Sequence, residues 1–331
     1  MTIDSDPPDS PGAVPDSPVT TAAPRSLRKI FIGADGIRAG WRFVIFVALF
    51  VIFVLVIVQE VMRSIPWLHE IARQAQKEGT LTPQFELIFE PVLLGLALLT
   101  AGIMSRIEKR RFAGYGIPLK GAFGKLFWQG TLWGLGFETA ETLVMYALGG
   151  FSFGSLALAG ISLVKFAVLW AIGMTFVGLY EEFLFRGYVQ FTLASGMGFW
   201  PAAILLSAAF GGAHLFNPGE GWVGALSVFT FGMFACFTLR RTGNLWFAIG
   251  LHAAGDYAET FLFSVPDSGL RATGHLLNAS VHGPRWLTGG AIGPEGSAIA
   301  FALFAIMFAI FHWAYPAKTN QATPHPAGQG Q

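Results

Sequence analysis

The stretch VGLYEEFLFRGYVQ, residues 177–190, places two adjacent glutamates and an arginine in one of the most apolar parts of the chain. Residues four apart on a helix share a face, so Glu182 and Arg186 can form an ion pair. Adjacent helical residues lie about 100° apart, which turns Glu181 in another direction. The stretch therefore predicts a helix with one neutralised carboxylate and one free one.

The composition surrounding this stretch is that of a membrane protein. Of 331 residues, 53% are hydrophobic and 12% are charged, and the mean hydropathy is +0.55. The formal net charge of +1 gives no reason to expect a nucleic-acid partner. The single cysteine, Cys236, cannot form an intrachain disulfide and is expected to be a buried small hydrophobe.

Apolar stretches long enough to approach a membrane span recur along the chain, since about 20 apolar residues cross the hydrocarbon core as a helix. We predict an all-α, polytopic transmembrane bundle with about eight spans, at 42–59, 87–105, 125–148, 162–190, 200–215, 222–239, 243–262 and 297–315. The membrane domain is placed at residues 25–315, between disordered, polar and Pro-containing tails at 1–24 and 316–331. Residues 66–79 are predicted to form an interfacial helix, and 264–296 a long loop.

The distribution of basic residues sets the expected orientation. With both termini in the cytoplasm, that side collects 14 of the 21 Lys and Arg residues and the other side collects 6, with Arg186 left inside the membrane. We therefore expect both ends to be cytoplasmic.

Two further polar sites follow Glu181 in the apolar region. FGGAH, residues 210–214, ends in His214, and its glycines allow a close approach between helices. HAAGD, residues 252–256, puts His252 and Asp256 four apart on one helical face. Intramembrane ionisable groups are functional candidates by default. Taken together they provide carboxylates and imidazoles for general acid and base chemistry.

Each site also has a structural explanation when taken alone. Glu182 and Arg186 could be a structural salt bridge with Glu181 turned toward water at a helix end. His214 could be a hydrogen-bonded core residue, and His252 could simply be oriented by Asp256. These explanations do not account for the grouping of all three sites in one region of a charge-poor chain.

The three motifs resemble those of a known family. EEFLFR fits Glu-Glu-x-x-x-Arg, FGGAH fits Phe-x-x-x-His, and HAAGD fits His-x-x-x-Asn/Asp, in the family's order. The chain is similar over about residues 160–260 to the CPBP (CAAX protease and bacteriocin-processing, or Abi) family of intramembrane glutamate endopeptidases, which includes the type II CAAX prenyl endopeptidases.

The resemblance implies a role for each motif residue. Glu181 would activate a water with the help of His214, and His252 with the residue at 256 would stabilise the oxyanion. Glu182 and Arg186 would hold the site together. The prenyl endopeptidases usually carry Asn at the last position, whereas many bacterial relatives carry Asp. Because an ionised Asp256 cannot donate a hydrogen bond, we expect it to accept one from His252 and orient that ring.

These implied roles lead to an expected reaction and location. The expected function is hydrolysis of a peptide bond inside the membrane, in a peptide or protein that is lipid-modified or membrane-inserted. The water would reach Glu181 through a cavity open to the cytoplasmic side if the substrate is a cytoplasmic C-terminal segment. Membrane lipid is the other expected partner, and a bacterial inner membrane the expected location.

Three alternatives remain open from the residues. A zinc enzyme could use Glu181, His214, His252 and Asp256 as ligands, although the chain has no His-Glu-x-x-His signature and the resemblance requires no cofactor. Glu138 and Glu141 in the third span would suit an ion- or proton-coupled transporter. A noncatalytic immunity or scaffold protein of the membrane is the third alternative.

Overall fold

The fold class predicted from the sequence is confirmed. The computed structural model describes residues 28–33 and 36–317, which are mainly helical, with strands of only two residues each. The predicted N-terminal tail, and the C-terminal tail from residue 318, lie outside the described residues.

Helices occupy all eight predicted stretches. They are α2 (Ala39–Ser64), α4 (Pro83–Ile107), α5 (Lys125–Ala147), α6 (Gly160–Arg186) with α7 (Tyr188–Met197), α8 (Phe199–His214), α9 (Trp222–Thr242), α10 (Trp246–Tyr257) with the π-helix η2 (Ala258–Phe263), and α12 (Ala298–Ala314). Among the described residues, α2, α4, the segment α6–α7 and α9 are long and apolar enough to cross a membrane, and α8 and α12 are shorter apolar helices. The number of spans stays a prediction.

The predicted fourth span is interrupted at Gly187. The backbone there leaves helical geometry, with φ −83° and ψ −123°, and α7 begins at the next residue. A side chain at this position would meet the backbone, since a Cβ on Gly187 would lie 2.3 Å from the carbonyl oxygen of Phe183. The break therefore sets the direction in which α7 leaves the end of α6.

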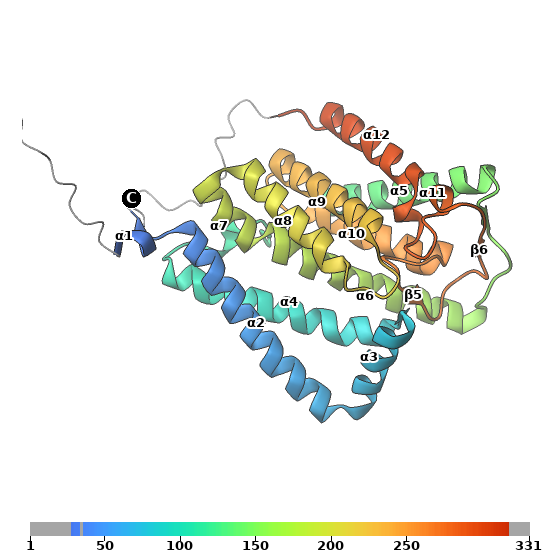
Figure 1. The fold of residues 1–331 in the computed structure, drawn as a ribbon, viewed down its shortest axis with the longest axis horizontal. Coiled ribbons are helices and arrows are strands. Elements are labelled where there is room, and N and C mark those ends of the chain that lie inside the picture. The colour runs from blue at the N-terminus through green and yellow to red at the C-terminus, as the bar shows by residue number, and fades with distance from the viewer. Residues whose placement is uncertain (1–27, 34–35, 318–331) are drawn as a thin grey trace, which may run out of the picture.

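The connections on the side away from the termini are ordered. The predicted interfacial helix is α3 (Pro66–Glu78), and Figure 1 shows it joining α4 to the end of α2 that is farther from α1. The predicted loop 264–296 contains α11 (Arg285–Thr288) and the short helix η3 (Pro294–Gly296). Strand pairs tie that loop to earlier connections: β3 (Thr80–Leu81) pairs with β5 (Arg271–Ala272), and β4 (Phe151–Ser152) with β6 (Ser280–Val281).

The remaining short elements lie on the side of the termini. They are α1 (Arg28–Phe31), the strand pair β1 (Ile32–Gly33) and β2 (Gly36–Ile37), and η1 (Phe112–Gly114).

A buried polar cluster joins three helices on this side. Arg42 of α2 forms an ion pair with Glu108 at 2.7 Å and donates to Ser195 of α7 at 2.7 Å. Tyr188 donates to the same Glu108. The cluster holds α2, α4 and α7 together.

Helix α10 is enclosed by its neighbours over most of its length. Residues 246–254 are all buried, and α10 packs against α5 through glycines. A Cβ on Gly130 would lie 2.0 Å from the carbonyl oxygen of Phe247, and a Cβ on Gly250 would lie 2.1 Å from that of Phe127. Small residues let helix backbones approach closely in membrane proteins. This packing fixes the position of the helix that carries His252. Cys236, on the neighbouring α9, is buried as expected.

Candidate active site

The predicted ion pair between Glu182 and Arg186 is present on α6. Arg186 Nη1 donates to Glu182 Oε1 at 3.1 Å, and both side chains are fully buried. The Arg186 guanidinium also lies over the ring of Phe210, with Cζ 4.3 Å from the ring centroid. Stacking on an aromatic face suits a planar, weakly hydrated cation. Arg186 thus neutralises Glu182 and connects α6 to α8.

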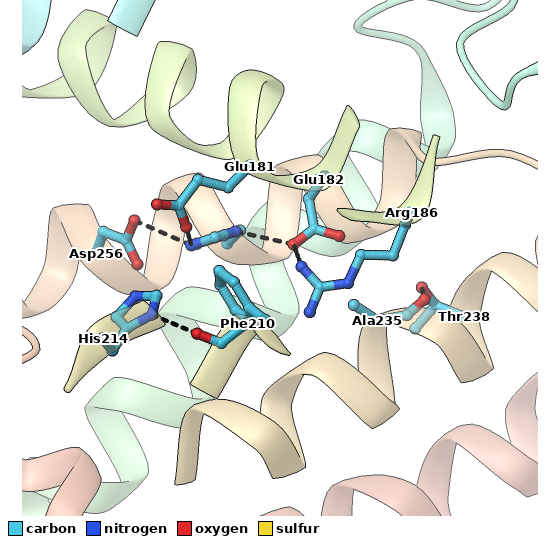
Figure 2. A network of polar contacts seen from close by, with 9 residues as sticks. Glu181, Glu182, Arg186, Phe210, His214, Ala235, Thr238 and Asp256 are labelled. Carbon is cyan, nitrogen blue, oxygen red and sulfur yellow. Dashed lines mark hydrogen bonds and ion pairs between the residues drawn. The ribbon is translucent and has the colours of Figure 1, made fainter. Parts of the chain in front are cut away.

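Glu182 also holds the imidazole of His252. His252 Nδ1 lies 2.9 Å from Glu182 Oε1, where it can only donate to a carboxylate. Its other ring nitrogen, Nε2, lies 3.5 Å from Glu181 Oε2 and 3.5 Å from Asp256 Oδ2. Figure 2 shows Glu181 and Asp256 on one side of the site and Glu182 with Arg186 on the other. The residue that orients His252 is therefore chiefly Glu182, which is closer than the Asp256 we expected.

Two of these carboxylates are partly exposed. The side chains of Glu181 and Asp256 are 22% and 17% exposed, whereas Glu182 is completely buried. This difference follows from the helical geometry, since adjacent residues of α6 point in different directions. Glu182 faces the protein interior, and Glu181 faces a solvent-accessible space.

His214 is positioned by its own helix. Its Nδ1 donates to the carbonyl oxygen of Phe210 at 2.9 Å, which leaves Nε2 as an acceptor. The Phe210 ring lies edge-on to His214, with centroids 4.7 Å apart, and 6.1 Å from the ring of His252. Among the described residues, no hydrogen bond or ion pair joins His214 to Glu181. Two cooperating catalytic residues are expected either to be in direct contact at about 3 Å or to be joined by one bridging water. Glu181 and His214 are not in direct contact, so their cooperation would need the bridging water.

One cavity brings the predicted residues together. It has a volume of about 350 Å³, and Glu181, His214, His252 and Asp256 all line it. Apolar side chains from α4, α9 and α12 complete its walls, among them Phe85, Phe231 and Phe304. The structure thus places all four side chains at one space, and their chemical roles stay predictions.

The direction of the cavity differs from the expected one. Its lining includes four residues of the connections on the side of α3, namely Leu81, Asn217, Ser268 and Leu270. Within the described chain, its lining includes no residue of the connections 108–124 and 243–245, which lie on the opposite side. If the termini are cytoplasmic, the cavity leads to the opposite side of the membrane. A cytoplasmic opening and cytoplasmic termini are therefore not compatible with this lining, and both stay predictions. The polar cluster around Glu108 lies on the side of the termini.

Sequence reasoning missed several acidic residues that line the cavity. They are Glu86 and Glu90 of α4, Glu259 of η2, and Asp267 and Glu295 of the loop. The sequence does indicate that Glu86 and Glu90 lie together, since they are four apart on one helical face at the edge of an apolar stretch. Glu259 follows His252 by seven residues on the same predicted span, and it is only 5% exposed.

The two glutamates of α5 have different surroundings. Glu141 Oε1 accepts a hydrogen bond from Ser297 Oγ at 2.7 Å, and the same hydroxyl accepts from the backbone N–H of Ala300 at the start of α12. Glu141 therefore stabilises the beginning of α12, a structural contact. Glu138 lines the cavity instead.

Burial governs the ionisation of the two loop carboxyl groups. It raises the pKa of Asp267, with the hydrogen bond from Thr260 Oγ1 at 3.0 Å acting in the opposite direction. Burial also raises the pKa of Glu295 well above its usual range, and the carboxylate of Asp267 adds to that shift. An environment of this kind disfavours negative charge that has no cationic partner.

Glu181, His214, His252 and Asp256 do not surround one point as zinc ligands would. Within the described chain, no group of three or more His, Cys, Asp or Glu side chains is arranged to hold a metal ion. His252 Nδ1 is engaged by Glu182, and its Nε2 lies between two carboxylates at 3.5 Å. The arrangement therefore does not fit a preformed zinc site.

The fold and the site together define an integral membrane protein, a helical bundle with a glutamate–histidine centre inside it. Residues 162–258 match the family model described as type II CAAX prenyl endopeptidase Rce1-like. This segment contains all three motifs, so the match confirms the resemblance found in the sequence and supports, at the level of the family, an intramembrane protease of CAAX type. No curated protein and no solved structure was found to match the chain.

Proposed function

We propose that the protein is an intramembrane endopeptidase that hydrolyses a peptide bond with a water activated by Glu181. The observation that carries the proposal is the position of His252, fixed through Nδ1 by Glu182 while Nε2 and Glu181 face the same cavity. The family match over residues 162–258 supports the reaction class.

In the proposed reaction, Glu181 takes a proton from a water while the water oxygen attacks the scissile carbonyl carbon. His214 accepts a hydrogen bond from this water through its free Nε2. The tetrahedral intermediate carries its negative charge on the former carbonyl oxygen. When the C–N bond breaks, Glu181 returns the proton to the leaving amine.

The oxyanion needs a hydrogen-bond donor, which His252 supplies when both ring nitrogens carry a proton. Nδ1–H donates to Glu182, and Nε2–H is then available to the developing oxyanion. The neighbouring carboxylates of Glu181 and Asp256 provide countercharge at Nε2. Asp256 acts as a partner of His252 in this scheme and not as a donor.

The substrate is proposed to be a peptide or protein segment that is membrane-inserted or lipid-modified. We further propose eight spans with both termini cytoplasmic, in a bacterial inner membrane, and a reaction that requires no metal. The substrate would then enter from the side of α3. Metal analysis of the purified protein, with activity measured before and after chelation, tests the last point.

The test of the function is cleavage of membrane peptides by protein in liposomes. Glu181→Gln, His214→Ala and His252→Ala are each expected to lower the rate by about 10²–10⁴-fold, the usual contribution of general acid–base groups. Glu60→Gln is the matched control, because Glu60 is an exposed residue paired with Arg63 on α2. Wild-type rates in all three site variants would refute the assignment.

An ion- or proton-coupled transporter is the second candidate, favoured by Glu138 on the wall of the cavity. It predicts ion-dependent transport that needs Glu138 and tolerates loss of His252. A noncatalytic immunity or scaffold protein would instead keep its activity after Glu181→Ala. Glu138→Gln and Glu181→Ala, added to the variants above, separate these candidates.

A further inference from the structure

The cavity extends well beyond the proposed catalytic residues, and its extension is acidic. Six more carboxyl side chains line it, and no Lys or Arg is among the lining residues of the described chain. We call this group the acidic vestibule; it consists of Glu86, Glu90, Glu138, Glu259, Asp267 and Glu295. The proposed mechanism uses none of them.

In three of these groups, one carboxylate oxygen is buried without a hydrogen-bond partner in the described part of the molecule. Glu259 is 5% exposed, and its Oε1 is buried without a partner, as are Glu90 Oε2 and Glu295 Oε1. A buried polar group that lacks a partner is costly, and buried carboxylates are ordinarily paired with cations. The vestibule therefore has the chemistry of a cation site without a cation supplied by the protein itself.

The backbone at Glu259 departs from regular α-helix. The helix containing His252 changes to a π-helix at Ala258, and Glu259 is its second residue. Short π segments inside α-helices are uncommon and often occur at functional sites. This local change accompanies the placement of Glu259 on the wall of the cavity.

The kind of cation follows from the distribution of the acids. A metal ion needs several ligands around one point, and no such group exists among the described residues. The acids instead come from α4, α5, η2 and the loop, around a space of about 350 Å³. A long cationic side chain, which makes several separate hydrogen bonds, suits carboxylates spread in this way.

The vestibule is within reach of a peptide held at the proposed catalytic centre. Glu259 follows His252 by seven residues, which is about 10 Å along a helix. An extended peptide advances about 3.3 Å per residue. A side chain that reaches Glu259 therefore belongs to a residue about three positions from the bond at the catalytic centre.

Building on the proposed function, we propose that the acidic vestibule binds the side chain of a Lys or Arg located about three residues from the scissile bond of the substrate. The protein would then select membrane-associated peptides that carry a basic residue beside an apolar segment. Glu259 would be the central contact, and the other five carboxyl groups of the vestibule line the same cavity around it.

The proposal is tested by binding and cleavage of matched peptide pools on protein in nanodiscs. Every peptide has an apolar segment and one fixed position, which is Lys in one pool and norleucine in the other. Further pairs of pools place this fixed position elsewhere along the peptide. Binding is measured on Glu181→Gln protein and cleavage on wild type. The Lys pool is expected to bind about 10- to 100-fold more tightly at one position, as for a hydrogen bond to a charged group.

The variants assign this preference to the vestibule. Glu259→Gln is expected to abolish the advantage of the Lys pool, and the control Glu60→Gln to keep it. If Glu259→Gln does not fold, Glu295→Gln, in the short helix before α12, provides the same test. Equal retention of the two pools at every position overturns the proposal, as does an advantage that survives both variants.

Two other outcomes are distinguishable. Binding of Ca²⁺ or Zn²⁺ alone that depends on Glu259, with no advantage of the Lys pool, would make the vestibule a metal site and overturn the proposal. Cleavage independent of Glu181, with the Lys preference in binding intact, would instead refute the proposed peptidase and leave the cation site standing.

Discussion

The glycines between α5 and α10 provide a test of how the site is positioned. A Cβ on Gly134 would lie 2.3 Å from the carbonyl oxygen of Leu251 and 3.0 Å from the backbone nitrogen of Gly255. Ordinary contact begins near 3.4 Å, so Gly134→Ala requires the two helices to separate locally by about 1.1 Å. Leu251 and Gly255 directly precede the two site residues of α10, His252 and Asp256.

The helix α10 has little room to move away from α5. On its other side, a Cβ on Gly178 of α6 would lie only 3.0 Å from the carbonyl oxygen of Ile249. We therefore expect Gly134→Ala to lower the free energy of unfolding by about 1–3 kcal/mol, as overpacking does. A misplacement of about 1 Å in a catalytic group can lower the rate by about 100-fold, and this is the loss expected in the cleavage assay.

The matched control is on the same helix. A Cβ on Gly136 would meet nothing within 4 Å, so Gly136→Ala should retain wild-type activity and gain up to about 1 kcal/mol from helix propensity. The assay is thermal unfolding in detergent, followed by peptide cleavage in nanodiscs. If Gly134→Ala is as stable and as active as Gly136→Ala, the close packing of α5 and α10 does not position the site.

Other outcomes follow from single groups. Glu182→Gln leaves the buried charge of Arg186 uncompensated and should cost about 3–5 kcal/mol of stability; an unchanged melting temperature would contradict the ion pair. His214→Ala should lower cleavage by about 10²–10⁴-fold with little change in melting temperature, since within the described residues this ring hydrogen-bonds only to its own helix; a large loss of stability would indicate a structural role. Burial and the nearby Asp267 carboxylate raise the pKa of Glu295 well above 4.5, so stability should fall as pH rises from about 4.5 toward the raised pKa. The Glu295→Gln variant should then have a higher melting temperature than wild type at neutral pH and the same melting temperature near about pH 4. Melting temperatures that equal those of wild type at both pH values would contradict the burial of this charge.

Local geometry explains which parts of the site the sequence could predict. The pair Glu182–Arg186 and the pair His252–Asp256 are each four apart, so a helix alone brings each pair to one face. The opposite direction of Glu181 follows from the same geometry. The helical stretches were predictable because long apolar segments can satisfy their backbone groups in lipid only as helices or closed barrels.

Contacts between helices explain what could not be predicted. The hydrogen bond from His252 to Glu182 joins residues 70 positions apart, and it forms only because glycines bring α10 close to its neighbours. The acidic vestibule combines α4, α5, η2 and the loop, and no periodicity within one segment reveals such a grouping. The order of the loop 264–296 depends on strand pairs with two earlier connections, which single-segment patterns do not show.

The aspartate at position 256 is consistent with this arrangement of charges. In the proposed mechanism, His252 must carry a proton on both nitrogens, and Glu182 alone is already shared with Arg186. An asparagine at 256 could donate to the oxyanion but would bring no charge to Nε2. When it is ionised, Asp256, at 3.5 Å, would bring that charge and leave the donation to His252. In the proposed mechanism, Asp in place of Asn would therefore act as a counterion, and His252 would be the donor to the oxyanion.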